Sequence, residues 1–331
     1  MPAPTSESMP AAFERLELLA LAAEAPKKRA LVIVNPYATT VSDRLRNLVV
    51  YALQARFEVD SVDTQARGHA TDLCREAAHE GYDVMIAFGG DGTVNEVANG
   101  LAGTATPLSC LPGGNTNVYC RILGIPGEIV DATEHLLRAA DDWQPRRVDL
   151  GRVNGRHFVF SSGVGLDASV VQRVDAHPRL KARFGPWYFT YAGLAVFNRR
   201  YLFAAPRLQT QVAGETIDGV TTIVQNASPY TYFRDRPIAI AGGAALDGGT
   251  LSGCVLQRAN PIDMPTLIWR LFSAKPRAGR HRRVREFTDA TELTITSADG
   301  RPVPLQVDGD HIDDVVEARY EIAPQSLTVI A

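Results

Sequence analysis

Residues 28–147 alternate between short apolar runs and amphipathic stretches, and this alternation limits the available folds more than any other feature of the chain. The apolar runs have the length of buried strands, and the stretches between them carry apolar residues at helical spacing. Strands that alternate with helices in this way build a parallel sheet covered on both faces. We therefore expect a doubly wound α/β domain over residues 28–147, preceded by an extension over residues 1–27.

Beyond about residue 147 the pattern changes to short β-type runs separated by Gly, Asn, Asp and Pro. Runs of this kind are typical of antiparallel sheets. We expect residues 148–319 to form a second, mainly antiparallel and β-sandwich-like domain with one helical insert near 169–200. Residues 320–331 are a candidate to complete the first domain. An active site would then lie in the cleft between the two domains.

The composition is that of an ordinary globular protein. Of the 331 residues, 45% are hydrophobic and 21% are charged, and the net charge is −3. A slightly acidic chain argues against a surface built for nucleic acid. The four cysteines show no metal-binding spacing and are typical of reduced cytoplasmic thiols. No run reaches the roughly 18 apolar residues of a spanning helix, so we expect a cytoplasmic protein whose membrane contacts are peripheral.

The stretch "FGGDGTVNEVANG", residues 88–100, turns from the third apolar run directly into a helical pattern. Glycines expose backbone N–H groups there, and a helix N-terminus adds partial positive charge, so the turn suits a phosphate. Glycine-rich turns also arise for steric reasons alone, and this one fits neither the GxGxxG nor the GxxxxGK spacing. Asp91 would repel a phosphate unless it faces a Mg²⁺ ion that bridges to the phosphate.

Two longer motifs, "GGDGTVNEVANGL" at 89–101 and "LPGGNTNVYCRILGIP" at 111–126, resemble those of the diacylglycerol kinase catalytic-domain family, which includes bacterial lipid kinases and the related sphingosine and ceramide kinases. Further matching runs are "RRVDLG" (146–151), "GVGLDA" (163–168), "AALDGG" (244–249) and "QVDGD" (306–310). The resemblance extends over nearly all of residues 30–331. It implies an ATP- and Mg²⁺-dependent lipid kinase, with diacylglycerol as the foremost acceptor and phosphatidic acid as the product.

The resemblance also implies which residues form the site. ATP would be held by Asn35, Thr39, Thr64, Gly89, Gly90, Asp91, Gly92, Thr93, Asn95, Glu96, Gly114 and Asn115. Asp91, Arg121 and Asp149 would form a charged network around the nucleotide Mg²⁺, with Asp91 facing the metal through water. Asp308 and Asp310 match a motif whose carboxylate takes the proton of the lipid hydroxyl, so together with Asp91 they are the expected catalytic residues.

The chain departs from the family pattern at several positions. Thr40 lies where a lysine often follows the first strand. The second glycine turn has Asn115 for threonine and Val118 for aspartate, and the last motif ends in Asp310 rather than glutamate. Gly248 removes a carboxylate from the structural Mg²⁺ site of bacterial relatives, so we do not expect that metal here.

Two stretches of the second half have a functional and a plainer interpretation. The basic run 275–285 suits anionic lipid headgroups and would bring the enzyme to a membrane surface, but such runs also occur as solvated loops. The aromatic run 184–197 is typical of a protein core. Within it, Trp187, Tyr188 and Phe189 are candidates to line a groove for acyl chains.

The sequence leaves other functions open. Asp308-Gly309 is also a favoured hairpin turn, and without the resemblance we would prefer that interpretation. An NAD kinase-like enzyme shares the GGDG motif, and a catalytically silent lipid- or nucleotide-binding protein would fit the missing lysine. A homodimer is compatible with the sequence, which says nothing firm about assembly.

Overall fold

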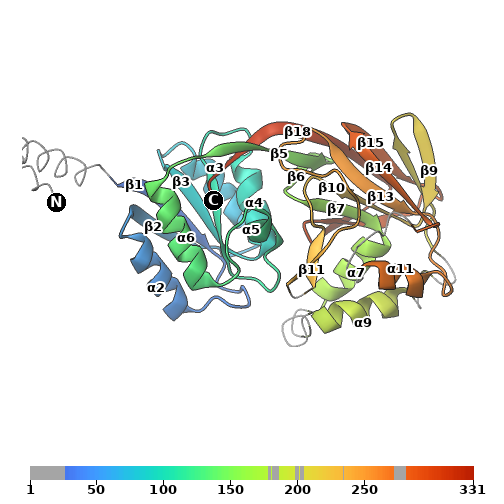
Figure 1. Ribbon diagram of the computed structural model, residues 1–331, viewed down its shortest axis with the longest axis horizontal. Coiled ribbons are helices and arrows are strands. Elements are labelled where there is room, and N and C mark those ends of the chain that lie inside the picture. Colours follow the sequence, from blue (N-terminus) through green and yellow to red (C-terminus); the bar gives the residue numbers. More distant parts are fainter. Residues whose placement is uncertain are drawn as a thin grey trace, which may run out of the picture.

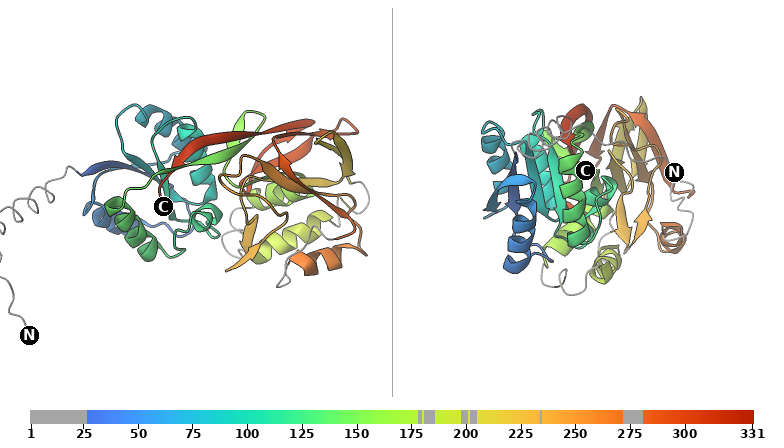
Figure 2. Two further views of the ribbon diagram at one scale, coloured as in Figure 1. Left: turned by 45° about the horizontal axis from the view of Figure 1, so that its top comes forward. Right: turned by 60° about the vertical axis from the view of Figure 1, so that its left-hand side comes forward.

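The computed structural model describes residues 27–177, 180, 186–197, 201, 205–233, 235–271 and 281–331. All of the predicted N-terminal extension except Lys27 lies outside the described residues. The chain forms two lobes that lie side by side along its long axis (Figure 1). Two strands, β5 (Arg146–Val153) and β18 (Glu317–Val329), run along both lobes and connect them (Figure 2).

The first lobe contains four parallel strands in the order β2-β1-β3-β4. Their bounds are β1 Lys28–Val34, β2 Phe57–Asp63, β3 Val84–Gly89 and β4 Leu108–Pro112. Every residue of β3 and β4 is buried, as expected for apolar strands covered on both faces. The predicted doubly wound α/β fold is therefore confirmed for this part of the chain.

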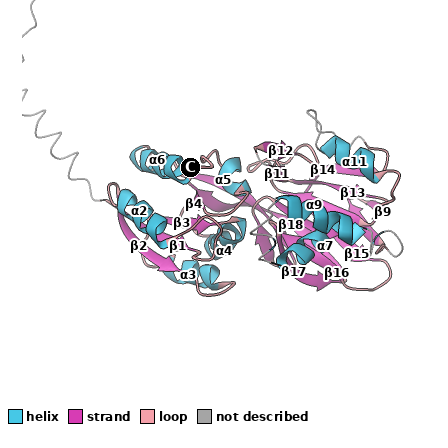
Figure 3. Cartoon of the chain, turned by 90° about the horizontal axis from the view of Figure 1, so that it is seen from below, coloured by secondary structure: helices cyan, strands magenta, loops and turns pink. Residues whose placement is uncertain are grey.

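Helices cover both faces of the parallel strands. Their bounds are α2 Asp43–Leu53, α3 His69–Ala77, α4 Asp91–Leu101, α5 Val118–Ile122 and α6 Ile129–Asp141. Figure 3 shows α2 and α6 on one side of the sheet and α3 and α4 on the other. Ser42 caps the start of α2, because its hydroxyl oxygen accepts the Leu45 N–H at 3.3 Å.

The second lobe is built mainly from antiparallel strands in two sheets. One sheet has the order β14-β13-β10-β7-β16-β17, and the other continues the parallel sheet through β18, β15, β8 and β9. The remaining bounds are β6 Arg156–Phe158, β7 Ser161–Gly165, β8 Leu208–Val212, β9 Glu215–Gly219, β10 Thr221–Gln225, β11 Thr231–Phe233, β12 Arg236–Ile238, β13 Leu251–Leu256, β14 Val284–Ala290, β15 Glu292–Ser297, β16 Val303–Val307 and β17 Asp310–Val315. An apolar cluster draws side chains from both sheets, so they form a sandwich as predicted.

Strand β18 joins the two lobes. It pairs antiparallel with β15 and β5, and at its end Val329 pairs with Leu108 in the parallel direction. The Ile330 N–H then donates to the Leu108 carbonyl at 3.0 Å. The end of the chain, within the predicted 320–331 segment, therefore adds to the edge of the first lobe's strands. Strand β5 spans the predicted boundary near residue 147.

Among the described residues, three helices flank the second lobe: α7 Leu166–Asp175, α9 Pro186–Val196 and α11 Met264–Leu271. Helices α7 and α9 correspond to the predicted helical insert. Tyr188 is buried against Val174 and Ala192, whereas the side chains of Trp187 and Phe189 lie outside the described residues, so the acyl groove stays a prediction. Among the helices that the structure describes, none combines the length and apolar character needed to cross a membrane.

Candidate functional site

A crevice of about 540 Å³ lies between the two lobes. The first lobe contributes residues that follow its four parallel strands, and the second contributes the start of α7, the segment before β11 and the turn between β16 and β17. Ligands of open α/β sheets bind at the carboxyl ends of the strands, and sites for small molecules have volumes of roughly 300–1,000 Å³. The crevice lies between the two lobes, where the sequence led us to expect the active site.

Most of the predicted site residues line this crevice. They are Asn35, Thr39, Thr64, Gly90, Asp91, Gly92, Thr93, Glu96, Gly114, Asn115, Asp308 and Asp310. The contacts that they make separate them into two groups. Some carboxylates hold the backbone of the crevice in place, whereas other side chains point toward its opening.

Two glycines are required by close approaches inside the crevice. A side chain at Gly92 would collide with the Asp310 carboxylate of the other lobe. A Cβ on Gly114 would lie 2.8 Å from the Gly90 Cα, so the two glycine turns touch. The steric interpretation of the glycines therefore holds, and it places the backbone of the first glycine turn directly against a carboxylate of the second lobe.

Asp91 ties the two glycine turns together. Its carboxylate oxygens accept the N–H groups of Val118 and Tyr119, both at 3.0 Å, and so cap the start of α5. The backbone N–H at Val118 is therefore satisfied from another turn. The Asp91 side chain also belongs to the crevice lining. That arrangement suits contact with a Mg²⁺ ion through water.

Glu96 fixes the turn that follows β2. Its carboxylate accepts the N–H groups of Gly68 and Ala70 at 2.8 and 3.2 Å, and its carbonyl accepts the Thr71 hydroxyl at 2.9 Å. Helix α4 and the start of α3 are thereby locked together. The same turn carries Arg67 into the crevice lining.

Asp308 is almost fully enclosed, with 3% of its surface exposed. One oxygen accepts the N–H groups of Phe160 and Ser161, both at 3.0 Å, and the other accepts Val159 N–H at 2.8 Å and Asn95 Nδ2 at 2.7 Å. Burial raises the pKa of Asp308 to about 6, although these donors oppose the shift. A carboxylate has about four acceptor positions, and all are used here. Asp308 therefore clamps the lobes together and has no acceptor position left for a substrate hydroxyl.

Asp310, two residues along the chain, has a different environment. Its side chain is 32% exposed, and its Oδ2 lies 3.8 Å from an Arg67 nitrogen. The Arg67 side chain also donates to the His311 carbonyl at 3.1 Å. Asp310 faces the glycine turn at Gly92. Of the two carboxylates in the Asp-Gly-Asp turn, Asp310 is the better placed to receive a proton.

Two predicted nucleotide contacts lie behind the crevice lining rather than in it. Gly89 ends β3, where a side chain would collide with Thr93. Asn95 is buried, and its amide donates to Asp308 and, at 2.9 Å, to the His157 carbonyl. Both residues support the lining in this structure, and the direct ATP contacts predicted for them stay predictions.

The predicted charged network around the metal also stays a prediction, and two of its three members lie outside the crevice lining. Asp149 is buried outside the crevice lining, and its oxygens accept Gly249 N–H at 2.6 Å and Gln325 N–H at 2.8 Å. It therefore holds β18 and the turn that contains the AALDGG run. Arg121 does not line the crevice either, and its guanidinium lies over the Tyr232 ring at 4.7 Å.

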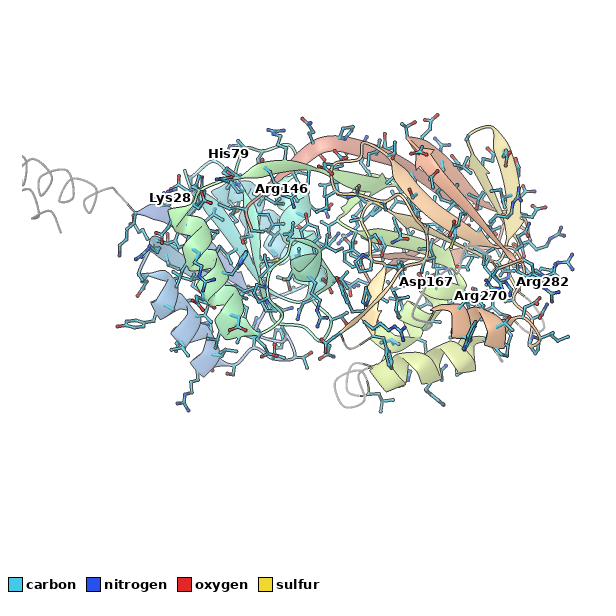
Figure 4. All side chains as sticks on the ribbon, viewed as in Figure 1. Lys28, His79, Arg146, Asp167, Arg270 and Arg282 are labelled. Carbon is cyan, nitrogen blue, oxygen red and sulfur yellow. The ribbon has the colours of Figure 1, made fainter. Side chains whose placement is uncertain are left out.

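Three polar residues of the second lobe were missed by the sequence reasoning. Asp167, near the start of α7 (Figure 4), accepts hydrogen bonds from the Tyr230 hydroxyl and, at 2.9 Å, from Gln306 Nε2. Burial raises the pKa of Asp167. Gln306 in turn accepts the Gly309 N–H at 3.0 Å and so links this wall to the Asp-Gly-Asp turn. The GVGLDA run was a signal for Asp167 and the QVDGD run for Gln306, but no motif indicated Tyr230.

The oxygen donors of the crevice lining suit a Mg²⁺ ion that brings further ligands of its own. Mg²⁺ takes oxygen ligands and keeps several waters, using one or two carboxylates together with substrate phosphates. Asp91 and Asp310 offer such carboxylates in the lining. Over the described ranges, no group of three or more His, Cys, Asp or Glu side chains is placed to hold a metal on its own. The crevice therefore fits a metal that arrives with a nucleotide.

Residues 29–153 match the sequence profile of the diacylglycerol kinase catalytic domain. A diacylglycerol kinase of Staphylococcus aureus (strain bovine RF122 / ET3-1) is 26% identical over 297 residues, which cover 86% of this chain and 87% of that protein. A diacylglycerol kinase of Bacillus subtilis (strain 168) is 35% identical over 174 residues, which cover 50% of this chain and 55% of that protein.

Solved structures show the same architecture. A crystal structure of a candidate diacylglycerol kinase from Bacillus anthracis (strain Sterne) superposes with a TM-score of 0.73 at 25% identity, covering 93% of this chain and 98% of the other. A second diacylglycerol kinase structure from that strain has a TM-score of 0.67 at 21% identity with the same coverage. The two-lobed fold is thus shared over nearly the whole chain.

Proposed function

We propose that this chain, which belongs to the diacylglycerol kinase catalytic-domain family, is a lipid kinase that transfers the γ-phosphoryl group of ATP to a hydroxyl of a membrane lipid. Diacylglycerol, named in the relatives, is the first acceptor, with phosphatidic acid as the product. The observation that carries the proposal is the contact between Gly92 in one lobe and Asp310 in the other. It brings a phosphate-binding backbone and a proton acceptor into one crevice.

In this proposal the first lobe binds the phosphates of ATP and the second lobe accepts the proton of the lipid hydroxyl. The backbone N–H groups after β3, at the start of α4, hold the phosphates. Mg²⁺, when bound with ATP, neutralises part of their charge. Asp310 receives the proton of the lipid hydroxyl as that oxygen attacks, since an alcohol is a poor nucleophile at neutral pH. Val170 and Val171 give the acceptor side of the crevice an apolar wall.

The acceptor is a membrane component, so the enzyme must reach a lipid surface from the cytoplasmic side. The surface around α11 suits this contact, because Trp269 is 71% exposed on it and Ile262 is also exposed. Arg282 and Arg283 both contact Asp263. Arg270 and Arg282 lie at this end of the second lobe (Figure 4). Apolar and cationic side chains together favour anionic lipid. Of the predicted basic run 275–285, residues 275–280 lie outside the described residues.

The α11 surface is tested by vesicle sedimentation. We expect Trp269→Ser to lower partitioning into vesicles of phosphatidylglycerol and phosphatidylcholine about tenfold, because tryptophan favours the membrane interface. Tyr51→Ser on α2 is the matched control, since Tyr51 is 76% exposed in the other lobe. Equal partitioning of the two variants would reject this surface.

The function is tested with labelled ATP, Mg²⁺ and a panel of acceptors: diacylglycerol, other hydroxyl lipids in mixed micelles, and NAD⁺. Mass spectrometry identifies the phosphorylated product. We expect transfer to a lipid and none to NAD⁺. Transfer to NAD⁺ alone would assign the chain to the NAD kinases, and ATP binding with no transfer would assign it to silent binding proteins.

A further inference from the structure

The charges that line the crevice are unbalanced. Its carboxylates are Asp91, Glu96, Asp167, Asp308 and Asp310, whereas Arg67 is the single Lys or Arg side chain among the described lining residues. A nucleoside triphosphate would add more negative charge to this space. Phosphoryl transfer depends on cations placed around the transferring group. Besides a metal, Arg67 is the lining group that supplies positive charge.

The backbone that carries Arg67 is firmly held. The Thr64 N–H donates to the Val34 carbonyl at 2.8 Å, and the Gly68 N–H donates to Glu96 at 2.8 Å. The turn after β2 is thereby fixed on both sides of Arg67. Its side chain is 62% exposed and reaches across the crevice to the second lobe.

The guanidinium of Arg67 meets the second lobe beside Asp310. It donates to the His311 carbonyl at 3.1 Å and lies 3.8 Å from Asp310 Oδ2. Asp310 in turn lies against Gly92, whose turn is the proposed phosphate site. A carboxylate and a phosphate side by side repel each other, and a cation between them relieves that repulsion.

We propose that Arg67 binds the γ-phosphoryl group during transfer and supplies the positive charge that the residues after β1 do not provide. The inference rests on the proposed function. As the bond between the γ-phosphorus and its bridging oxygen breaks, the lipid oxygen bonds to phosphorus and its proton passes to Asp310. Arg67 keeps its protons throughout. The planar guanidinium can donate hydrogen bonds to two phosphate oxygens at once, whereas a lysine ammonium acts as a single point charge.

A latch between the lobes is the competing role for Arg67. An exposed ion pair contributes roughly 0–1 kcal/mol to stability, so a latch would matter little to folding. A latch would also leave the affinities for ADP and for an ATP analogue equally affected by a change at Arg67. The two roles can therefore be separated by binding measurements.

The test compares Arg67→Gln with Arg75→Gln. Arg75 lies on α3 outside the crevice lining, and its side chain is 63% exposed, close to the value for Arg67. Calorimetry with Mg²⁺ measures the affinity for ADP and for the β,γ-imido analogue of ATP. We expect Arg67→Gln to weaken binding of the imido analogue about tenfold, as for a lost charged hydrogen bond, while ADP affinity changes less than about twofold. We expect kcat for lipid phosphorylation to fall about 100-fold.

Arg67→Lys is a second variant that keeps the charge. Its affinity for the imido analogue should lie between those of the wild type and Arg67→Gln. Equal weakening of ADP and analogue binding in Arg67→Gln, or no change in either, would overturn the proposal, as would an Arg67→Lys variant as weak as Arg67→Gln. If the wild type phosphorylates no lipid, the proposed function fails while the nucleotide measurements still decide the role of Arg67.

Discussion

Asp308 and Asp310 lie two residues apart on one turn, yet one belongs to the floor of the crevice and the other to its mouth. Asp308 is buried and accepts four N–H groups from two segments of the chain. Asp310 is partly exposed and lies beside Arg67 and Gly92. Gly309 between them has φ of 83°, a conformation that favours glycine, and it lets the turn place the two carboxylates differently. Neighbours in one motif thus have different surroundings: Asp308 on the floor joins the lobes, and Asp310 at the mouth is the carboxylate that we propose receives the proton.

The largest expected effect on folding comes from the floor. Asp308→Asn would turn an amide N–H₂ toward N–H donors that now bond a carboxylate, which leaves buried donors without acceptors. We expect a loss of about 3 kcal/mol in the free energy of unfolding at pH 7, measured by urea denaturation. Asp310→Asn should change the same quantity by less than about 1 kcal/mol. Equal losses in the two variants would remove the distinction between floor and mouth.

A smaller effect concerns pH. Burial raises the pKa of Asp308 from an ordinary value of 3.8 to about 6. The folded state then binds the proton more tightly than the unfolded state, so the stabilisation is complete below about pH 4 and is lost as pH rises through 6. The stability difference between the wild type and Asp308→Asn should therefore be about 2 kcal/mol larger at pH 4 than at pH 7. Denaturation curves across this range measure it, and a constant difference would contradict the assignment.

Much of the fold could be predicted from the sequence because local patterns and packing agree. Apolar runs became the buried parallel strands, and Ser42 begins a helix where its hydroxyl can cap it. The change near residue 147 marks a real change from parallel to antiparallel pairing. The part played by β18 was harder to foresee, because pairing between Val329 and Leu108 joins residues far apart in the sequence.

The candidate site was predicted less completely than the fold. Motifs indicated which turns meet, but they did not indicate which side chains point into the crevice and which point behind it. Asp149 and Asn95 are residue types that often bind ligands, but their side chains form hydrogen bonds within the protein. Arg67 was overlooked because a single arginine in a turn carries no pattern. Its proposed role follows from the folded crevice, where Arg67 is the single Lys or Arg among the described lining residues and five carboxylates surround the same space.

The most direct test of this account is single-turnover transfer from labelled ATP to diacylglycerol, with the wild type and Asp310→Asn compared in the same mixed micelles. We expect the rate of Asp310→Asn to fall about 1,000-fold, within the range for loss of a general base, while its affinity for ATP and its thermal midpoint stay close to those of the wild type. Transfer by Asp310→Asn at the wild-type rate would show that the proton goes elsewhere and would contradict the division between the floor and the mouth.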